Sequence, residues 1–339
     1  MKKIIHLLST SKFSGAENVV IQICSMFSDQ YEMIYVCKSG EIEEKLTQNN
    51  IKYVLFNHVL DLNKIIKEVN PDIIHAHDVR ASIYSCLFFK GKIISHIHGN
   101  SIAMRKKSCK SMIYKIFCKR FLKIIWVSSS CFNSFIYRNL IANKSLILKN
   151  VLFNFPLKEN YDMSNHRYDL LYLGRLDYEK NPLLFVEVVN KLKKSITNIS
   201  AVMVGNGVLE KDCIELIQKY KLTGNVDLLG FIENPYEVIA NSKLLVMTSI
   251  YEGMPMAALE SLALGKPIYA TKTDGLVEIV VDNKNGYLTN NIELLVKEIC
   301  KTLTDDSLLS EQSENAYKTF IEYNNILNYK MTLERIYES

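Results

Sequence analysis

Two glutamates, Glu252 and Glu260, stand eight positions apart in a segment suited to a ligand rich in hydroxyls. The apolar run at 243–247 predicts a buried parallel strand, and residues 255–264 predict a helix with proline in its first turn. Between strand and helix, backbone N–H groups point outward, on the side where parallel sheets bind ligands. Because carboxylates accept hydrogen bonds, this pair predicts contacts to a sugar and a ribose. The simpler interpretation, a helix-dipole contact and a solvated helix residue, accounts less well for the turn between them.

Two cations, Arg175 and Lys180, flank a second predicted strand-to-helix turn, between a strand at 169–174 and a helix at 181–192. The arginine offers a fixed fork of donors and the lysine a mobile point charge, a combination that suits a diphosphate. The alternative is a pair of surface cations near a helix start. A Gly-x-Gly turn beginning at Gly205 follows the next predicted strand; alone it would be weak support for a nucleotide site.

His98 is the histidine that we expect at a site, because it precedes a glycine at the carboxyl end of a predicted strand, 92–98. Near neutral pH an imidazole can donate or accept a hydrogen bond. His75, His77 and His96 are expected to be hydrogen-bonded structural residues within or beside the sheet.

Residues 104–123 hold eight basic residues and no acidic ones, interleaved with large apolar side chains. At helical spacing, Met112, Lys115, Ile116 and Lys119 fall near one another and near Lys123, which predicts a basic amphipathic helix. Such a helix favours an anionic membrane surface, where each cation contributes about 1 kcal/mol. The alternative is a solvated face whose apolar side packs on the domain. Nucleic acid is not an expected partner, because no nucleic-acid motif accompanies the run.

Length and composition predict a soluble globular protein of two domains, with 339 residues, 48% hydrophobic and 23% charged. The apolar part of the first eight residues is too short for a signal peptide and is expected to form a strand. The eight cysteines lack paired or zinc-binding spacing, which predicts reduced thiols in a cytoplasmic protein. We therefore expect a cytoplasmic protein, peripheral on the inner face of the plasma membrane.

Strand-like and helix-like segments alternate along the whole chain, which predicts an α/β fold with parallel sheets. We expect a first domain at 1–155, a linker at 153–167, and a second domain at 165–323. A closing helical stretch at 307–337 is expected, with a last helix at 326–337. The expected strands lie at 3–8, 33–37, 53–56, 73–77, 92–98, 124–128, 145–149, 169–174, 201–204, 226–231 and 243–247.

These motifs together resemble the retaining nucleotide-sugar glycosyltransferases of family GT4, over nearly the whole chain. The E-x7-E spacing matches at Glu252 and Glu260, and the family's G-R-L-x-x-E-K pattern matches at 174–180. Gly265-Lys266-Pro267 is also similar to the family. The resemblance implies the GT-B fold, with two doubly wound Rossmann-like domains facing across a cleft and residues 324–339 crossing back to the first.

The resemblance also implies roles for individual residues. Arg175 and Lys180 would bind the diphosphate, Glu252 the sugar hydroxyls and Glu260 the ribose, with His98 near the reacting centre. Gly15 would approach the donor phosphate and Glu17 the acceptor, although Ser14 replaces a glycine usual in the family. The remaining implied donor-binding residues are Gly205, Phe231, Ile232, Gly253, Met254, Pro255 and Met256.

The expected reaction is transfer of a sugar, with retention, from a nucleotide donor to a glycan or polyprenyl-linked acceptor of O-antigen or capsule synthesis. The expected donor is a UDP-sugar. No metal motif is evident and the diphosphate already has two cations, so we expect no metal and no cofactor. Two alternatives remain, a GT-B nucleotide-sugar epimerase and a non-catalytic partner subunit at the membrane. The intact cation and carboxylate pairs argue against both.

Overall fold

The computed structural model describes residues 1–339 except 12–13, 100, 156–160 and 162–165. The chain divides into two compact units, Met1–Phe153 with Asn325–Ser339, and Asn154–Asn324. The predicted linker at 153–167 and the predicted second-domain start at residue 165 fall mostly outside the described residues. Each unit contains one parallel sheet covered by helices, so the predicted α/β class with two Rossmann-like domains is confirmed.

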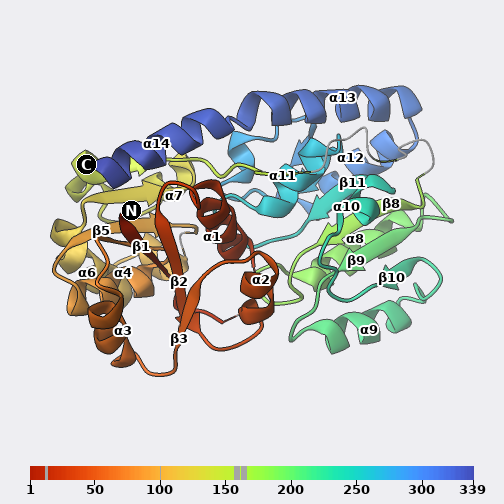
Figure 1. Ribbon diagram of the computed structural model, residues 1–339. Helices are drawn as coiled ribbons and strands as arrows, with labels where there is room; N and C mark the ends of the chain where they lie inside the picture. The colour runs from red at the N-terminus through yellow and green to blue at the C-terminus, as the bar shows by residue number, and fades with distance from the viewer. Residues whose placement is uncertain (12–13, 100, 156–160, 162–165) are drawn as a thin grey trace. The chain divides into compact units, whose positions relative to one another are not determined.

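The sheet of the first unit has seven parallel strands in the order β3-β2-β1-β4-β5-β6-β7 (Figure 1). Its strands read as nearly continuous apolar runs because helices cover both faces. The order reverses between β1 and β4, and ligands bind at such a reversal beyond the carboxyl ends of the strands. The strands are β1 Lys3–Leu7, β2 Glu32–Lys38, β3 Tyr53–Phe56, β4 Ile73–Ala76, β5 Lys92–Ile97, β6 Lys123–Trp126 and β7 Ser145–Ile147.

The helices of this unit follow the strands in alternation, as a doubly wound fold requires. The last helix of the chain belongs to the same unit, and its Tyr337 packs edge-on against Phe27 and His75. The helices are α1 Gly15–Met26, α2 Ile42–Gln48, α3 Asp61–Val69, α4 Val79–Phe88, α5 Ile102–Arg105, α6 Cys109–Phe117, α7 Ser129–Asn133 and α14 Ile326–Glu338, with 3-10 turns at Cys118–Arg120, Arg138–Leu140 and Ala142–Lys144.

The single helix predicted over 104–123 is wrong. Helix α5 ends at Arg105, and α6 begins after Ser108, whose backbone is extended. The Ser108 side chain accepts from the backbone N–H of Ser111 while the Ser111 side chain accepts from that of Ser108, so a capping box starts a new helix there. Lys123 begins strand β6 instead of extending the helical face.

The sheet of the second unit has six parallel strands in the order β10-β9-β8-β11-β12-β13, with its reversal between β8 and β11. One apolar cluster, including Phe185, Val189 and Leu244, packs helices against this sheet. The elements are β8 Tyr168–Leu173, α8 Pro182–Leu192, β9 Ala201–Val204, α9 Glu210–Lys219, β10 Val226–Leu228, α10 Tyr236–Ala240, β11 Ser242–Met247, α11 Met256–Ala263, β12 Ile268–Ala270, a 3-10 turn Leu276–Glu278, β13 Gly286–Leu288, α12 Ile292–Leu303 and α13 Asp306–Tyr323.

The closing stretch is two helices, α13 and α14, divided at Asn324 and Asn325. The Asn325 side chain accepts from the backbone N–H of Asn328 and so caps α14, as predicted for a separate last helix. Throughout the described part of the chain, no helix has both the length and the apolar character needed to cross a bilayer.

Candidate active site

The strand reversal of the second unit brings the two predicted motifs together. Lys180, from the loop after β8, lies 2.5 Å from a carboxylate oxygen of Glu252, from the loop after β11. The hydroxyl of Ser249 donates to the same oxygen over 2.7 Å. The Glu252 side chain is only 7% exposed, so this charge pair is strengthened by its low-dielectric surroundings. Residues 72 positions apart thus form one polar centre at the edge where ligands bind.

Local backbone chemistry fixes the position of Lys180. The carboxylate of Asp177 accepts from the backbone N–H of Lys180 over 3.0 Å. The next residue, Asn181, adopts the left-handed conformation at φ 49°, and Pro182 then starts α8. The hydroxyl of Thr248 donates to the Asn181 carbonyl over 2.8 Å, which ties this turn to the end of β11.

Arg175 is held by carboxylates of its own loop. Its guanidinium lies 2.7 Å from Asp177 and 3.3 Å from Glu179, and its side chain is 40% exposed. The hydroxyl of Tyr251 donates to Glu179, so the loop after β11 also contacts this ion-pair network. Asp177 and Tyr251 were not predicted as site residues, because single acidic and aromatic residues in a loop carry no spacing signal.

Glu260 lies on α11 and is buried, with 8% of its surface exposed. Burial raises the pKa of its carboxyl to about 7. Within the described residues its side-chain carboxyl has no hydrogen-bond or ion-pair partner, which leaves its acceptor capacity available to a ligand. A buried carboxyl with a strongly raised pKa at a ligand-binding edge is a typical feature of a functional site.

Two glycines allow the loops at this edge to approach one another closely. Gly205 has φ +137°, and a Cβ there would lie 2.0 Å from the carbonyl oxygen of Gly174. Its N–H donates to the carbonyl of Gly230 over 2.7 Å. A Cβ at Gly275 would lie 2.1 Å from the carbonyl oxygen of Gly253. The loops after β8, β9 and β10 therefore meet at the edge that holds Arg175 and Lys180.

The other predicted donor-binding residues lie on the same edge of this sheet. Phe231 is half-exposed and Ile232 is partly buried in the segment after β10, while Gly253, Met254 and Met256 are buried. Pro255 is the N-cap of α11, with an extended backbone, so the helix starts one residue later than predicted. The structure thus gathers Arg175, Lys180, Gly205, Phe231, Ile232, Glu252, Gly253, Met254, Pro255, Met256 and Glu260 within one unit.

In the first unit, the predicted residues Gly15 and Glu17 begin helix α1. Gly15 is exposed, whereas Glu17 is 4% exposed and accepts hydrogen bonds from the hydroxyls of Thr10 and Ser14. Ser14, which replaces the family's glycine, thus holds the carboxylate of Glu17. The predicted contact of Glu17 with an acceptor stays a prediction.

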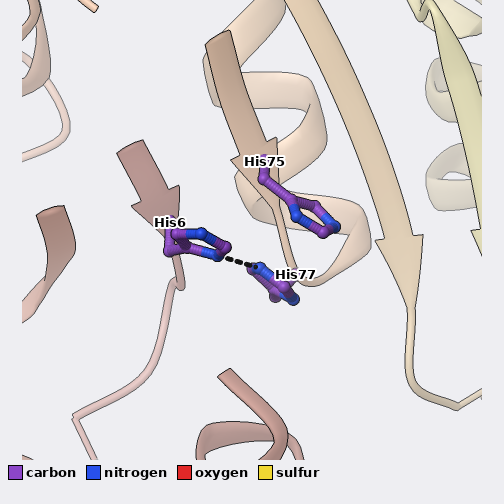
Figure 2. Close-up of side chains that lie close together, drawn as sticks. All are labelled: His6, His75 and His77. Atoms are coloured by element: carbon purple, nitrogen blue, oxygen red, sulfur yellow. Dashed lines mark hydrogen bonds between the residues drawn. The ribbon is translucent and has the colours of Figure 1, made fainter. Parts of the chain in front are cut away.

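Histidines gather on one face of the first sheet. His6 of β1 pairs in register with His75 of β4, and the imidazoles of His6 and His77 are joined by a 2.9 Å hydrogen bond (Figure 2). His77 is in turn 3.0 Å from His98, and His75 is 2.9 Å from the hydroxyl of Tyr337. The predicted hydrogen-bonded character of His75 and His77 is therefore confirmed, and His6 is an unpredicted member of the cluster.

His96 differs from that prediction, because neither of its ring nitrogens has a hydrogen-bond partner among the described residues. Its ring instead stacks on His98, with centroids 4.2 Å apart. Burial lowers the pKa of His6 and His98 to about 3, and it lowers the pKa of His75, His77 and His96 well below the ordinary value. All five imidazoles are therefore neutral at pH 7.

Neutral imidazoles are also metal ligands, and two overlapping groups have ring nitrogens within 4.8 Å of one another: His6 with His75 and His77, and His77 with His96 and His98. Nitrogens that share a tetrahedral zinc ion stand about 3.4 Å apart. The close His6–His77 and His77–His98 pairs are already hydrogen-bonded to each other. The geometry therefore favours a hydrogen-bonded cluster.

Comparison with known proteins identifies both halves of the chain. Residues 157–319 match the model of "Glycosyl transferases group 1", and residues 13–144 match "Glycosyltransferase Family 4". An alpha-1,4-N-acetyl-D-galactosaminyltransferase of Campylobacter jejuni, whose name gives an undecaprenol-diphosphate-linked substrate, is 26% identical over 93% of this chain and 93% of its own length. A UDP-Gal:alpha-D-GlcNAc-diphosphoundecaprenol alpha-1,3-galactosyltransferase of Escherichia coli is 24% identical over 96% and 94%.

Solved structures agree on the fold. Anabaena HepE, crystallised with UDP and glucose, superimposes with a TM-score of 0.87 at 18% identity, and the alignment covers 100% of both chains. Staphylococcus aureus TarM superimposes with a TM-score of 0.80 at 14% identity, covering 100% of this chain and 99% of TarM. With both family models matched and the two parallel-sheet domains present, the chain belongs to the GT-B glycosyltransferases of the family 4 type.

Proposed function

We propose that this glycosyltransferase moves a sugar from a UDP-sugar to a hydroxyl of a polyprenyl-diphosphate-linked glycan, in synthesis of a bacterial surface polysaccharide such as O-antigen or capsule. The observation that carries the proposal is the Lys180–Glu252 pair at the strand reversal of the second unit. Support for the acceptor class comes from the undecaprenol-linked substrates named for two relatives. Support for the nucleotide comes from the UDP bound in a structure of the same fold.

In this mechanism the cations act on the leaving group. As the bond between sugar and diphosphate breaks, negative charge grows on the diphosphate, and Lys180 and Arg175 stabilise it. Arg175 would exchange its contacts with Asp177 and Glu179 for the phosphate. Glu252 would accept from hydroxyls of the donor sugar while Lys180 turns to the phosphate.

The remaining steps are proposed from the family resemblance and from the chemistry of these groups. Glu260 would accept from the ribose hydroxyls, and His98 would contact the donor sugar. Sugar transfer with retention would proceed by front-face attack, with the leaving phosphate taking the proton of the acceptor hydroxyl. Two cations in place at the diphosphate make a metal ion unnecessary for neutralising its charge.

The direct test supplies the purified protein with a panel of UDP- and GDP-sugars, each with and without a lipid-diphosphate-linked acceptor. We expect an acceptor-dependent product from a UDP-sugar, with the anomeric configuration of the donor preserved by NMR. Conversion of a UDP-sugar without any acceptor would instead identify an epimerase. Failure of every donor to bind or react would identify a non-catalytic partner.

Metal independence is tested by chelation. We expect turnover to be unchanged after dialysis against excess EDTA, because Arg175 and Lys180 neutralise the leaving diphosphate without help. The measurement is the initial rate before and after dialysis, and after adding back Mg²⁺ or Mn²⁺. Loss of turnover that Mg²⁺ or Mn²⁺ restores would contradict the proposal.

Helix α6 supplies a surface suited to a membrane. Its inward residues Ser111 and Tyr114 are buried, whereas Met112, Ile113 and Ile116 are exposed, the last by 70%. These three apolar side chains lie at the surface, whereas Tyr114 and the partly buried Phe117 of the same helix pack in the core of the unit. The cations beside them are exposed as well, at Lys106, Lys107, Lys110, Lys115, Lys119 and Arg120. We propose that this face, α6 with its flanking cations, holds the enzyme on the inner face of the plasma membrane, where a polyprenyl-linked acceptor resides.

Vesicle co-sedimentation tests the proposed membrane face. We expect binding to vesicles of equal parts phosphatidylcholine and phosphatidylglycerol, and little to phosphatidylcholine alone. Replacing Lys107 and Lys119 with glutamine should weaken binding about 30-fold, since each cation contributes about 1 kcal/mol. The matched control replaces two exposed lysines of the second unit, Lys219 and Lys301. Binding indifferent to phosphatidylglycerol and to salt would contradict the proposal, because salt screens exposed charges.

A further inference from the structure

The ion pairs at the carboxyl edge of the second sheet hold more carboxylates than cations. Lys180 lies 2.5 Å from Glu252. Arg175 lies 2.7 Å from Asp177 and 3.3 Å from Glu179. Two positive and three negative charges leave this group with a formal charge of −1. A diphosphate is itself an anion, so it gains the attraction of the two cations only by displacing carboxylates that already hold them.

Asp177 is fixed in place by the turn on which it lies. Its Oδ1 accepts from the backbone N–H of Lys180 over 3.0 Å, and its Oδ2 faces Nη1 of Arg175 at 2.7 Å. The Asp177 side chain is 17% exposed, whereas that of Arg175 is 40% exposed and ends a flexible chain. The carboxylate therefore stays at the turn when the guanidinium moves, and their ion pair has to break.

Glu179 engages the other terminal nitrogen of the same guanidinium. Its Oε2 lies 3.3 Å from Nη2 of Arg175, and its Oε1 accepts from the hydroxyl of Tyr251. Burial and this hydrogen bond raise the pKa of Tyr251, so the hydroxyl keeps its proton and remains a donor. An end-on bidentate contact to a phosphate uses the same two nitrogens of the arginine. Since Glu179 is 48% exposed, we expect Asp177 to be the stronger competitor.

The competition has its largest consequence after sugar transfer. Transfer leaves the nucleotide with a free terminal phosphate, whose second ionisation at about pH 6 adds negative charge that the donor lacks. Cations without a competing carboxylate would hold this product more tightly than the donor. Product release limits the turnover of many enzymes, so a carboxylate that takes back a cation favours turnover.

We propose that Asp177 is a positioning residue that competes with the diphosphate for Arg175 and thereby keeps the nucleoside diphosphate product weakly bound. In this role Asp177 touches neither the sugar nor the phosphate and acts through the guanidinium alone. The inference rests on the proposed function, in which Arg175 binds the diphosphate. Its consequence is that removal of this carboxylate tightens the binding of the product.

Asp177→Asn separates the competing role from the structural role of the same side chain. The asparagine oxygen can still accept from the backbone N–H of Lys180, while the amide nitrogen replaces the oxygen that faces Arg175. We expect the affinity for UDP, measured by isothermal titration at neutral pH, to rise about 3- to 10-fold. Asp177→Ser, which also keeps an acceptor for the turn, should raise it similarly, and Glu179→Gln should raise it less.

A double-mutant cycle tests whether Asp177 acts through Arg175. In an Arg175→Gln background no guanidinium is left to compete for, so adding Asp177→Asn should change the UDP affinity less than about twofold. The matched control is Asp227→Asn, which removes an equal charge from the exposed pair of Arg167 and Asp227 in the same unit. The control should leave the UDP affinity within about twofold. A gain in affinity cannot arise from loss of the fold, and melting temperatures identify any variant that is unfolded.

Two results would overturn the inference while the proposed function stands. One is UDP binding that both Asp177 variants, folded, leave unchanged or weaken, because Asp177 would then orient Arg175 toward the phosphate. The other is an equal gain in the wild-type and Arg175→Gln backgrounds, because Asp177 would then repel the nucleotide through its charge alone. Failure of the wild type and of every variant to bind UDP would overturn the proposed UDP-sugar function, and this inference with it.

Discussion

Replacing Lys180 with methionine should lower kcat/KM for the donor about 10- to 150-fold. The substitution removes a charge-assisted hydrogen bond to the leaving diphosphate, which is worth about 1.5–3 kcal/mol in the transition state. It also leaves Glu252, 7% exposed, without its cationic partner at 2.5 Å. Because the charge on the diphosphate grows during bond breaking, the larger part of the loss should appear in kcat. Steady-state kinetics with the UDP-sugar found in the donor panel measure it.

Lys191 provides a matched control on the adjacent helix of the same unit. It also lies 2.5 Å from a glutamate, Glu293, but that carboxylate is 76% exposed. Exposed ion pairs contribute little, so Lys191→Met should keep kcat/KM within about twofold of the wild type. Equal effects of the two substitutions, or full turnover by Lys180→Met, would show that the diphosphate is not held at the turn after β8.

The second unit shows how much of the fold and site can be predicted from sequence. Buried parallel strands are nearly uniform apolar runs bounded by glycine and polar turns, so the strand at 243–247 and the helix starting at Pro182 were both predicted within one residue. In parallel sheets, ligands bind beyond the carboxyl ends of the strands. The loops carrying Arg175, Lys180 and Glu252, and the helix carrying Glu260, could therefore be assigned to one edge before any contact was known.

The direct contacts within the site could not be predicted, because they depend on strand order. Lys180 meets Glu252 only because β8 and β11 are neighbours, and β9 and β10 lie between them in the chain. The position of His6 beside His75 could not be predicted either, because the two residues are 69 positions apart in the chain and become neighbours only in the sheet. Nothing in the local sequence of β1 distinguishes His6 from an isolated core histidine.

The helix predicted over 104–123 failed for a different reason. Its composition and periodicity fit one amphipathic helix, but two serines, Ser108 and Ser111, form a capping box that interrupts it. Hydrogen bonds from a side chain to the nearby backbone can end one helix and start another. The composition and periodicity of a 20-residue segment do not reveal such hydrogen bonds. The exposure of Met112 and Ile116 was equally outside sequence reasoning, because an amphipathic pattern does not say which face is covered.

Affinity for a UDP-sugar should rise about 10- to 100-fold from pH 5 to pH 8. Burial raises the pKa of Glu260 to about 7, so its carboxyl is neutral in the free protein at pH 5 and mostly ionised at pH 8. An ionised carboxylate accepts hydrogen bonds from ribose hydroxyls about twice as strongly as a neutral acceptor does. An intact UDP-sugar does not itself titrate in this range, and the five clustered histidines stay neutral. Isothermal titration at several pH values measures the effect.

The free energy of unfolding should fall as pH rises, whereas the affinity for the UDP-sugar rises. The carboxyl of Glu260 has a higher pKa in the folded protein, about 7, than its ordinary value of 4.5. The folded state therefore binds the proton more tightly, and the contribution to stability present below pH 4.5 is lost as pH rises through about 7. This pKa difference lowers the free energy of unfolding at pH 8 by about 3 kcal/mol relative to its value below pH 4.5. Glu260→Gln should accordingly raise the free energy of unfolding at pH 8 by up to about 3 kcal/mol.

The same Glu260→Gln variant tests the assignment to the ribose. It should bind the UDP-sugar about as weakly at pH 8 as the wild type does at pH 5, and its affinity should be nearly independent of pH. Glu293→Gln, at an exposed carboxylate of the same unit, should leave the wild-type pH profile intact. If Glu260→Gln gained stability at pH 8 but kept the pH-dependent affinity, Glu260 would be a buried carboxyl that the nucleotide does not contact. The variant could instead gain stability and bind the UDP-sugar weakly at every pH. That result would mean that the buried charge of Glu260 destabilises the protein but is needed to bind the ribose.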